Sequence, residues 1–290
     1  MRAFVYERPT VLADAVALLA ELGDGARLLA GGTDLIIRLR DRSIEPAVVV
    51  DLKGIAELDA DIRTLDARGL RIGARTTMTA IAADPRIRDD HEALAEAASV
   101  VGSVQIRNRA TLAGNICNAS PAADTAPALL VDGATVVVAG PDGPRRIPID
   151  AFFVRSGVTA LGPGELVTAI ELPRPPRPRG SVHVRRTRRR GHDLASVTLT
   201  AAVSSDGVTR LAYGSLGPRP VVVEDGTGVL ADPASPERTK MERLEALFVD
   251  ASPSPRSMRA SPEYRLAMLH VLALRAVRIA LDRRATRSAR

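Results

Sequence analysis

The stretch Leu28-Leu29-Ala30-Gly31-Gly32-Thr33-Asp34-Leu35 decides the fold of this chain. An apolar run over 26–30 precedes the two glycines and a helical pattern follows over 35–42, which predicts a strand, a tight turn and a helix. Glycines let the backbone approach a ligand closely, and such a turn directs successive N–H groups at an anion such as a phosphate. The same residues are also typical of a turn with a helix cap, and they match neither the dinucleotide fingerprint nor the P-loop.

A second segment, from Thr111 to Asp124, has no regular hydrophobic period. Its small residues leave room for a ligand, and its hydroxyl, amide and carboxylate groups can bind a ribose or the edge of a heterocycle. The alternative is a long polar loop that satisfies its own backbone. Because one chain contains two such segments, the sequence favours a large nucleotide ligand held between them.

Helices and strands are expected on both sides of these segments. Helices are predicted over 10–22, with Thr10 as N-cap and Gly23 as the stop, and over 79–83, 91–100, 237–248 and 261–284. Strands are predicted over 47–51, 70–73, 166–172, 196–204 and 209–214, and a hairpin joins 134–139 to 145–149. The Pro- and Arg-rich stretch 173–180 is the best candidate for a domain boundary.

The composition indicates a soluble globular protein and excludes several kinds of site. The 290 residues suffice for one large domain or two smaller ones, and 46% of them are hydrophobic. The single cysteine, Cys117, excludes an internal disulfide, a Cys-ligated zinc site and an iron–sulfur cluster held by this chain alone. We expect Cys117 to be a small packing residue in a loop. The sequence shows neither a signal peptide nor a membrane span, so we expect a cytoplasmic protein. We also expect no bound metal.

The basic character of the chain is confined to one segment. The net charge is +6, but eight arginines and no acidic residue lie between Arg174 and His192, and without those arginines it would be −2. The run Arg185-Arg186-Thr187-Arg188-Arg189-Arg190 is typical of a solvated loop, and contact with an acidic protein or an anionic cofactor are the alternatives. A basic, non-redox module that binds nucleic acid is a distant alternative, because only 2% of the residues are aromatic and no known reader motif surrounds the run.

Together these motifs resemble the FAD-binding medium subunits of the molybdenum hydroxylases, the family of xanthine dehydrogenase and carbon monoxide dehydrogenase. The most specific matches are residues 30–35, 111–115 and 118–124. The further matches, in order along the chain, are 4–9, 70–74, 105–108, 188–189 ahead of 193–195, and 259–265. The resemblance therefore extends over essentially the whole chain.

The resemblance implies an α+β fold in which a two-lobed FAD-binding domain (PCMH-like) precedes a smaller C-terminal domain with an antiparallel sheet and helices. The expected boundaries are 1–173 for the FAD-binding domain, with lobes of about 1–56 and 57–173, and 174–290 for the C-terminal domain. FAD would lie extended between the lobes. Carried over residue by residue, its contacts fall on Leu29, Ala30, Gly31, Gly32, Thr33, Asp34, Leu35, Val101, Thr111, Gly114, Asn115, Asp124, Leu166 and Arg185.

The resemblance also assigns roles to these residues. The 30–35 loop would hold the pyrophosphate, Asp124 would contact the nucleotide, and Val101 and Leu166 would make backbone or apolar contacts. Arg185 matches a lysine that many relatives place near the flavin ring, where a cation stabilises the anionic reduced flavin. The second wall of the site, along a phosphate and the ribityl chain, would consist of Thr111, Gly114 and Asn115.

The implied activity is that of an oxidoreductase subunit that transfers electrons. A molybdopterin-binding large subunit would perform the hydroxylation, and a small subunit would carry [2Fe–2S] clusters whose electrons the flavin passes to NAD⁺ or another acceptor. A carbon-monoxide-dehydrogenase-like subunit with an acceptor other than NAD⁺ is the alternative within the family. The chain departs from the family pattern at Ala113, where relatives have glycine, and at His183, where they often have an aromatic residue. A positive φ at Ala113 would weaken the FAD site.

Overall fold

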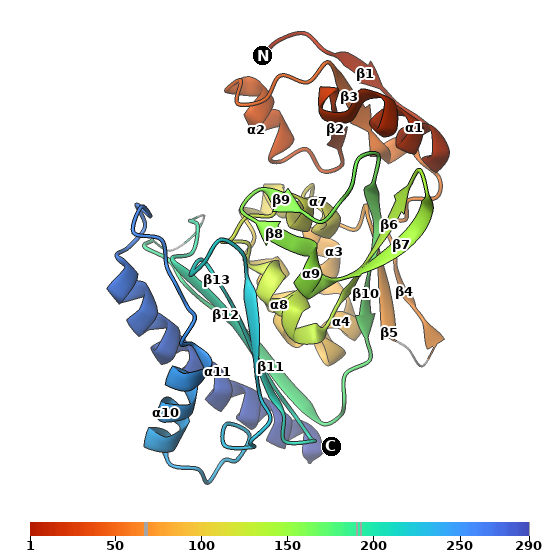
Figure 1. Cartoon of the computed structure of the whole chain (residues 1–290). Helices are drawn as coiled ribbons and strands as arrows, with labels where there is room; N and C mark the ends of the chain where they lie inside the picture. The colour runs from red at the N-terminus through yellow and green to blue at the C-terminus, as the bar shows by residue number, and fades with distance from the viewer. Residues whose placement is uncertain (67–68, 190, 192, 290) are drawn as a thin grey trace.

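Three main sheets follow one another along the chain in the computed structural model, which describes residues 1–66, 69–189, 191 and 193–289 (Figure 1). The last arginine of the basic run, Arg190, lies outside the described residues, as does His192. Helices pack against all three sheets, so the predicted α+β class is confirmed. Within the described residues, no helix is both long and apolar enough to cross a bilayer.

The first sheet is small and parallel. It consists of β1 (Val5–Glu7), β3 (Val48–Asp51) and β2 (Ala26–Leu29), in that order. The intervening helical segments are α1 (Leu12–Leu22), η1 (Gly23–Gly25) and α2 (Leu35–Arg40), and η2 (Leu52–Gly54) follows β3.

The two ends of α1 test the predicted helix signals. The predicted stop is confirmed, because Gly23 has φ of +49° and its N–H bonds to the carbonyl of Leu19. The predicted N-cap is wrong, because Val11 occupies the cap position, without a side-chain hydrogen bond. The carbonyl of Thr10 instead accepts from the N–H of Ala56, so this residue belongs to the preceding turn.

The second sheet is antiparallel, in the order β4-β5-β10-β6-β7. Its strands are β4 (Ile62–Thr64), β5 (Gly69–Gly73), β6 (Thr135–Gly140), β7 (Gly143–Pro148) and β10 (Leu166–Pro173). The predicted hairpin is confirmed, with Gly140 opposite Gly143. The segments that surround this sheet are α3 (Met78–Ala83), α4 (Pro85–Asp90), α5 (Glu92–Ser99), α6 (Val104–Arg107), α7 (Leu112–Cys117), α8 (Thr125–Asp132), α9 (Ile149–Phe152), β8 (Phe153–Arg155) and β9 (Val158–Thr159).

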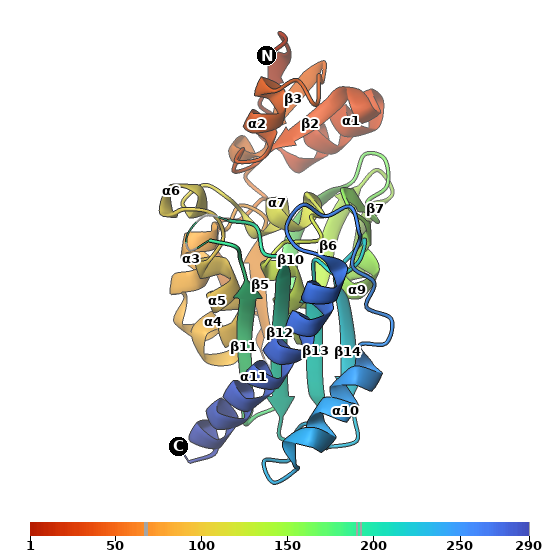
Figure 2. The same ribbon diagram turned by 90° about the vertical axis from the view of Figure 1, so that its left-hand side faces the viewer.

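The third sheet is an antiparallel meander with helices on both faces. Its strands are β11 (Arg179–Arg186), β12 (Val197–Ser204), β13 (Thr209–Gly214) and β14 (Val221–Asp225). The helices α10 (Glu237–Leu247) and α11 (Pro262–Ser288) cover one face (Figure 2). The helices α5 and α8 contact the other face. The predicted cap of the last helix is confirmed, because the Ser261 hydroxyl accepts from the N–H of Tyr264.

Strand β11 corrects the interpretation of the basic run as a solvated loop only for its first two residues, since Arg188 and Arg189 lie beyond the strand and are exposed as predicted. Arg185 and Arg186 are the last two residues of this strand, and residues 179–183 are buried. The strand forms because β12 pairs with it along its whole length and helices cover both of its faces. This tertiary environment outweighs the local Pro- and Arg-rich composition, which is typical of a connector.

Helix α8 is buried along its whole length, between the second and third sheets. Near its end, Asp132 is 7% exposed and accepts from Arg179 Nη2 at 2.6 Å, while its other oxygen lies 3.0 Å from His91 Nδ1. Burial by itself raises the pKa of Asp132, but the charges of Arg179 and His91 outweigh burial and hold the pKa below its usual value. A buried ion pair therefore joins α8 to the first residue of β11.

Two groups of buried apolar residues form the cores. The larger includes Ile72, Met78 and Phe152 and fills the space around the second sheet and its helices. The smaller lies between the third sheet and α10 and α11, where the rings of Tyr213 and Phe248 meet edge to face at 5.4 Å. The larger core also includes Ala26, Val48 and Val50 of the first sheet, so it joins the first two sheets, whereas the smaller core belongs to the third sheet.

We predict that Gly180→Ala strongly destabilises the protein. A Cβ atom at Gly180 would lie 2.0 Å from the carbonyl oxygen of Ala280, so α11 would have to move away from β11. Overpacking of this kind costs about 1–3 kcal/mol of unfolding free energy, which urea unfolding measures. Gly226→Ala is the matched control, because a Cβ there meets no atom within 4 Å. Equal unfolding free energies for the two variants would contradict the close packing.

We also predict that Asp132→Asn removes part of the acid sensitivity of the fold. Because the folded pKa of Asp132 is depressed, its charge contributes stability above the unfolded pKa, about 4, and that stability is lost as the pH falls through the folded pKa. At pH 7 the variant should lose about 3–5 kcal/mol, since Arg179 is left buried without its partner. Urea unfolding at pH 7 and at lower pH measures both effects. A variant whose stability falls as steeply with acid as the wild type would contradict this role.

Candidate functional site

A cleft of about 450 Å³ lies where the first sheet meets the rest of the molecule. The end of β2 and the start of α7 lie on the two sides of this boundary (Figure 1). Most of the residues that line the cleft come from three stretches far apart in the sequence, within 27–44, 100–124 and 185–194. The two segments singled out in the sequence therefore meet at one site.

The glycine turn forms one wall of the cleft. Gly32 has φ of +78°, a conformation that favours glycine, and its carbonyl accepts from the N–H of Ile36. A Cβ at Gly31 would lie 2.1 Å from the carbonyl oxygen of Arg109, so the turn packs directly against the second segment. Among the described residues, the N–H groups of Gly32, Thr33 and Asp34 have no acceptor. Three adjacent free donors at the cleft fit the phosphate oxygens of a dinucleotide cofactor.

The second wall is helical at its start, which corrects the expectation of an irregular polar segment. The Thr111 hydroxyl accepts from the N–H of Gly114 at 3.1 Å and caps α7, while Leu112 and Ile116 are fully buried. Ala113 lies inside this helix without a positive φ, so the weakening expected from a positive φ does not arise. An N-cap and two buried side chains are enough to form this short helix.

Beyond α7 the chain reverses at Ala119, which has φ of +45°. The Asn115 side-chain oxygen accepts from the Thr125 hydroxyl at 2.6 Å, which leaves its NH₂ group to donate elsewhere. Cys117 packs against the larger core, as predicted, but it ends α7 instead of lying in a loop, and it also lines the cleft. Burial raises the pKa of its thiol to about 12, so the thiol stays protonated at neutral pH.

An ion pair closes the side of the cleft nearest the third sheet. Arg185 Nη1 donates to Asp124 Oδ2 and to the carbonyl oxygen of Val100, both at 2.9 Å, and Nη2 donates to the carbonyl of Asp193. The other oxygen of Asp124 lies 3.3 Å from His183 Nε2. The Arg185 side chain is 15% exposed, so its charge lies at the cleft and not in open solvent.

Most of the predicted contact residues line the cleft. They are Ala30, Gly31, Gly32, Thr33, Asp34, Leu35, Val101, Thr111, Gly114, Asn115, Asp124 and Arg185. The structure does not bring Leu29 or Leu166 to it. Leu166 is fully buried in the larger core, and the Leu29 side chain lies beneath the glycine turn, 2.9 Å from where a Cβ at Gly32 would stand.

Several lining residues were not predicted from the sequence. Two are cationic: Arg27 on β2, and Arg38, four residues after Asp34 on α2. The helical spacing from Asp34 to Arg38 is a signal that could have identified the second of them. Asn118 and Ser120 belong to the polar segment already singled out and could have been included on the same grounds.

Known proteins share both the sequence and the fold of this chain. The FAD binding domain of molybdopterin dehydrogenases matches residues 2–175, and the CO dehydrogenase flavoprotein C-terminal domain matches residues 183–280. The xanthine dehydrogenase FAD-binding subunit of Escherichia coli O157:H7 is 33% identical over 272 residues, which cover 92% of each chain. The carbon monoxide dehydrogenase medium chain of Afipia carboxidovorans is 32% identical over 278 residues, 94% of this chain and 95% of that one.

A solved structure gives the same result. Carbon monoxide dehydrogenase from Hydrogenophaga pseudoflava, in a form that lacks the Mo-pyranopterin moiety of its molybdenum cofactor, contains a chain similar to this one with a TM-score of 0.90. The two are 29% identical, and the match covers 97% of this chain and 98% of the other. The predicted family, fold class and FAD cofactor are therefore confirmed. The chain belongs to the FAD-binding medium subunits of the xanthine and carbon monoxide dehydrogenase family of oxidoreductases.

Proposed function

We propose that this subunit takes electrons from [2Fe–2S] clusters of a partner subunit and passes them through FAD to NAD⁺ or another acceptor. A molybdopterin-binding large subunit would oxidise the substrate. Two observations support this division of labour: the relatives are named as single chains or subunits of dehydrogenases, and this chain has one cysteine, too few for an iron–sulfur cluster. We further propose that the complex works in the cytoplasm.

The meeting of the two segments at one cleft is the observation that carries the proposal. The free N–H groups of Gly32, Thr33 and Asp34 would bind the pyrophosphate, with Arg27 and Arg38 as nearby countercharges. When bound, FAD would supply the site with two-electron and one-electron chemistry. On the second wall, Thr111, Gly114 and Asn115 would hold a phosphate and the ribityl chain. At the side of the cleft nearest the third sheet, Val101, Asp124 and Arg185 would hold the flavin end.

We propose the same domain limits as the sequence suggests. The FAD-binding part would comprise residues 1–173, with lobes of about 1–56 and 57–173, and the C-terminal domain would comprise 174–290. The separate parallel sheet, the two cores and the limits of the two family matches support this division. The cleft would then lie between the lobes and be completed by Arg185 of the C-terminal domain.

The experiment that tests the proposal is an FAD titration of the purified chain, followed by the visible absorption of the flavin. We expect one FAD per chain, and we expect Gly32→Ala to weaken the affinity. A side chain at a φ of +78° strains the turn by about 1–2 kcal/mol. The free chain relieves this strain by moving the turn out of its binding conformation, so the same energy is lost from binding, which corresponds to a roughly tenfold higher Kd. Gly25→Ala is the control, because a Cβ there meets no atom within 4 Å. A wild-type chain that binds no FAD would refute the proposed site.

Cys117 provides an independent test of where FAD binds. At pH 8.5 an ordinary thiol is about half ionised, whereas a pKa of about 12 leaves roughly one thiolate in a thousand or fewer. We therefore expect very slow alkylation by iodoacetamide, and still slower alkylation once FAD fills the cleft. Mass spectrometry of this single-cysteine chain measures both rates. Rapid labelling that FAD leaves unchanged would place the cofactor away from α7.

A further inference from the structure

The carboxylate of Asp124 connects the cleft to a buried histidine. One of its oxygens accepts from Arg185, and the other faces His183 Nε2 at 3.3 Å. His183 and Arg185 are two residues apart on β11, so their side chains lie on the same face of the strand and both reach Asp124. The His183 side chain is 2% exposed, so it is shielded from solvent while remaining two contacts from the cleft.

The hydrogen bonds of His183 accommodate both of its charge states. Asp124 only accepts, so Nε2 carries a proton. Nδ1 lies 3.1 Å from the hydroxyl of Thr200, a fully buried residue on β12. A threonine hydroxyl donates to a neutral Nδ1 and accepts from a protonated one. The ring can therefore gain or lose a proton without losing a hydrogen bond.

A proton on His183 would change the net charge at this end of the cleft. Arg185 is paired with Asp124, so the two together carry no net charge toward a bound flavin. Reduction of FAD by two electrons and one proton leaves one negative charge in the cleft. A second proton from solvent, taken up by His183, would turn the neutral pair into a triad of charge +1 and compensate that negative charge.

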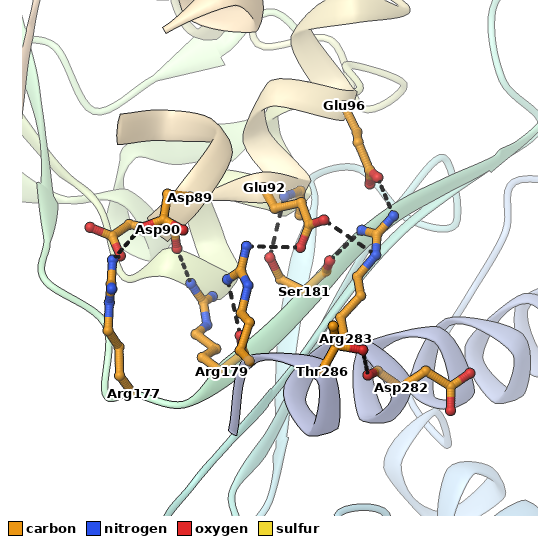
Figure 3. Close-up of polar contacts among 12 residues, drawn as sticks. Asp89, Asp90, Glu92, Glu96, Arg177, Arg179, Ser181, Asp282, Arg283 and Thr286 are labelled. Carbon is orange, nitrogen blue, oxygen red and sulfur yellow. Dashed lines mark hydrogen bonds and ion pairs between the residues drawn. The ribbon is translucent and has the colours of Figure 1, made fainter. Parts of the chain in front are cut away.

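The backbone of His183 is fixed by residues outside the cleft. Its N–H donates to Glu96 Oε2 at 2.8 Å, and Glu96 Oε1 accepts from Arg283 Nη2 at 2.6 Å. Arg283 Nη1 also donates to the carbonyl of Ser181, and Figure 3 shows Arg283 reaching from α11 toward both Glu96 and Ser181. Strand β11 is thus held between α5 and α11 at the position from which His183 and Arg185 extend to Asp124.

We propose that His183 is a positioning residue that couples proton uptake to reduction of the flavin, through Asp124 and Arg185. The inference rests on the proposed function, because it requires the flavin end of FAD to lie beside Arg185. The charged groups that face His183 come from the elements packed around it: Asp124 at the start of α8, Glu96 on α5, Arg283 on α11 and Arg185 on β11 itself. Glu96 and Arg283 neutralise one another, so Asp124 is the charged group whose attraction to His183 increases when the ring is protonated.

The test is a redox titration of the FAD-loaded full chain against a dye of known potential, at a series of pH values. Over this pH series, the wild type should take up as much as about one proton more per two electrons than His183→Gln does. Gln keeps a donor for Asp124 but does not titrate. His270→Gln is the matched control, because His270 lies on α11, contacts Phe248 and the carbonyl of Leu266, and is absent from the cleft lining. It should behave as the wild type does.

Each outcome decides the proposal. Identical proton uptake by wild type and His183→Gln, both with bound FAD, would overturn it while leaving the proposed function intact. A wild-type chain that binds no FAD would defeat both. If His183→Gln alone fails to bind FAD, NMR titration of the His183 ring in the wild type decides instead. A titration midpoint that rises on reduction of the flavin supports the coupling, and an unchanged midpoint refutes it.

Discussion

Two ion pairs attach the buried helix α8 to strand β11, and the rest of the structure depends on this attachment. Asp124 at the start of the helix pairs with Arg185, and Asp132 at its end pairs with Arg179. Carboxylates this buried are tolerated only when they are paired. A shift of β11 by one residue would separate both pairs and turn its side chains to the opposite faces. One pair of elements therefore sets both the wall of the cleft and the contact between the second and third sheets.

The sequence predicted the elements whose local signals agree with their surroundings. The hairpin at 140–143, the stop at Gly23 and the Ser261 cap all follow from turn and cap residues. The composition of β11 is typical of a connector, yet it is a strand because β12 and the two helices α5 and α11 surround it. Helix α7 was missed because its residues are small and its stability comes from Leu112 and Ile116, which pack on distant parts of the chain. Contacts of this kind have no local signature.

The candidate site could be predicted from the sequence where its backbone conformation requires glycine. Gly31 must be glycine because of the close approach to Arg109, and Gly32 because of its positive φ, so the turn is recognisable from sequence alone. The pairing of Arg185 with Asp124 was not predictable, because 60 residues separate them and nothing local marks the partner. For the same reason the sequence suggested a simple cation beside the flavin, whereas the structure shows a neutral pair with a histidine behind it.

The location of Arg283 has a consequence for biosynthesis. The glycine turn precedes Arg283 in the chain and is therefore synthesised well before it. Glu96, in contrast, lacks its partner until residue 283 has left the ribosome, and β11 is covered on its second face only once α11 has followed it. The wall that presents Arg185 is therefore complete only once α11 has been synthesised.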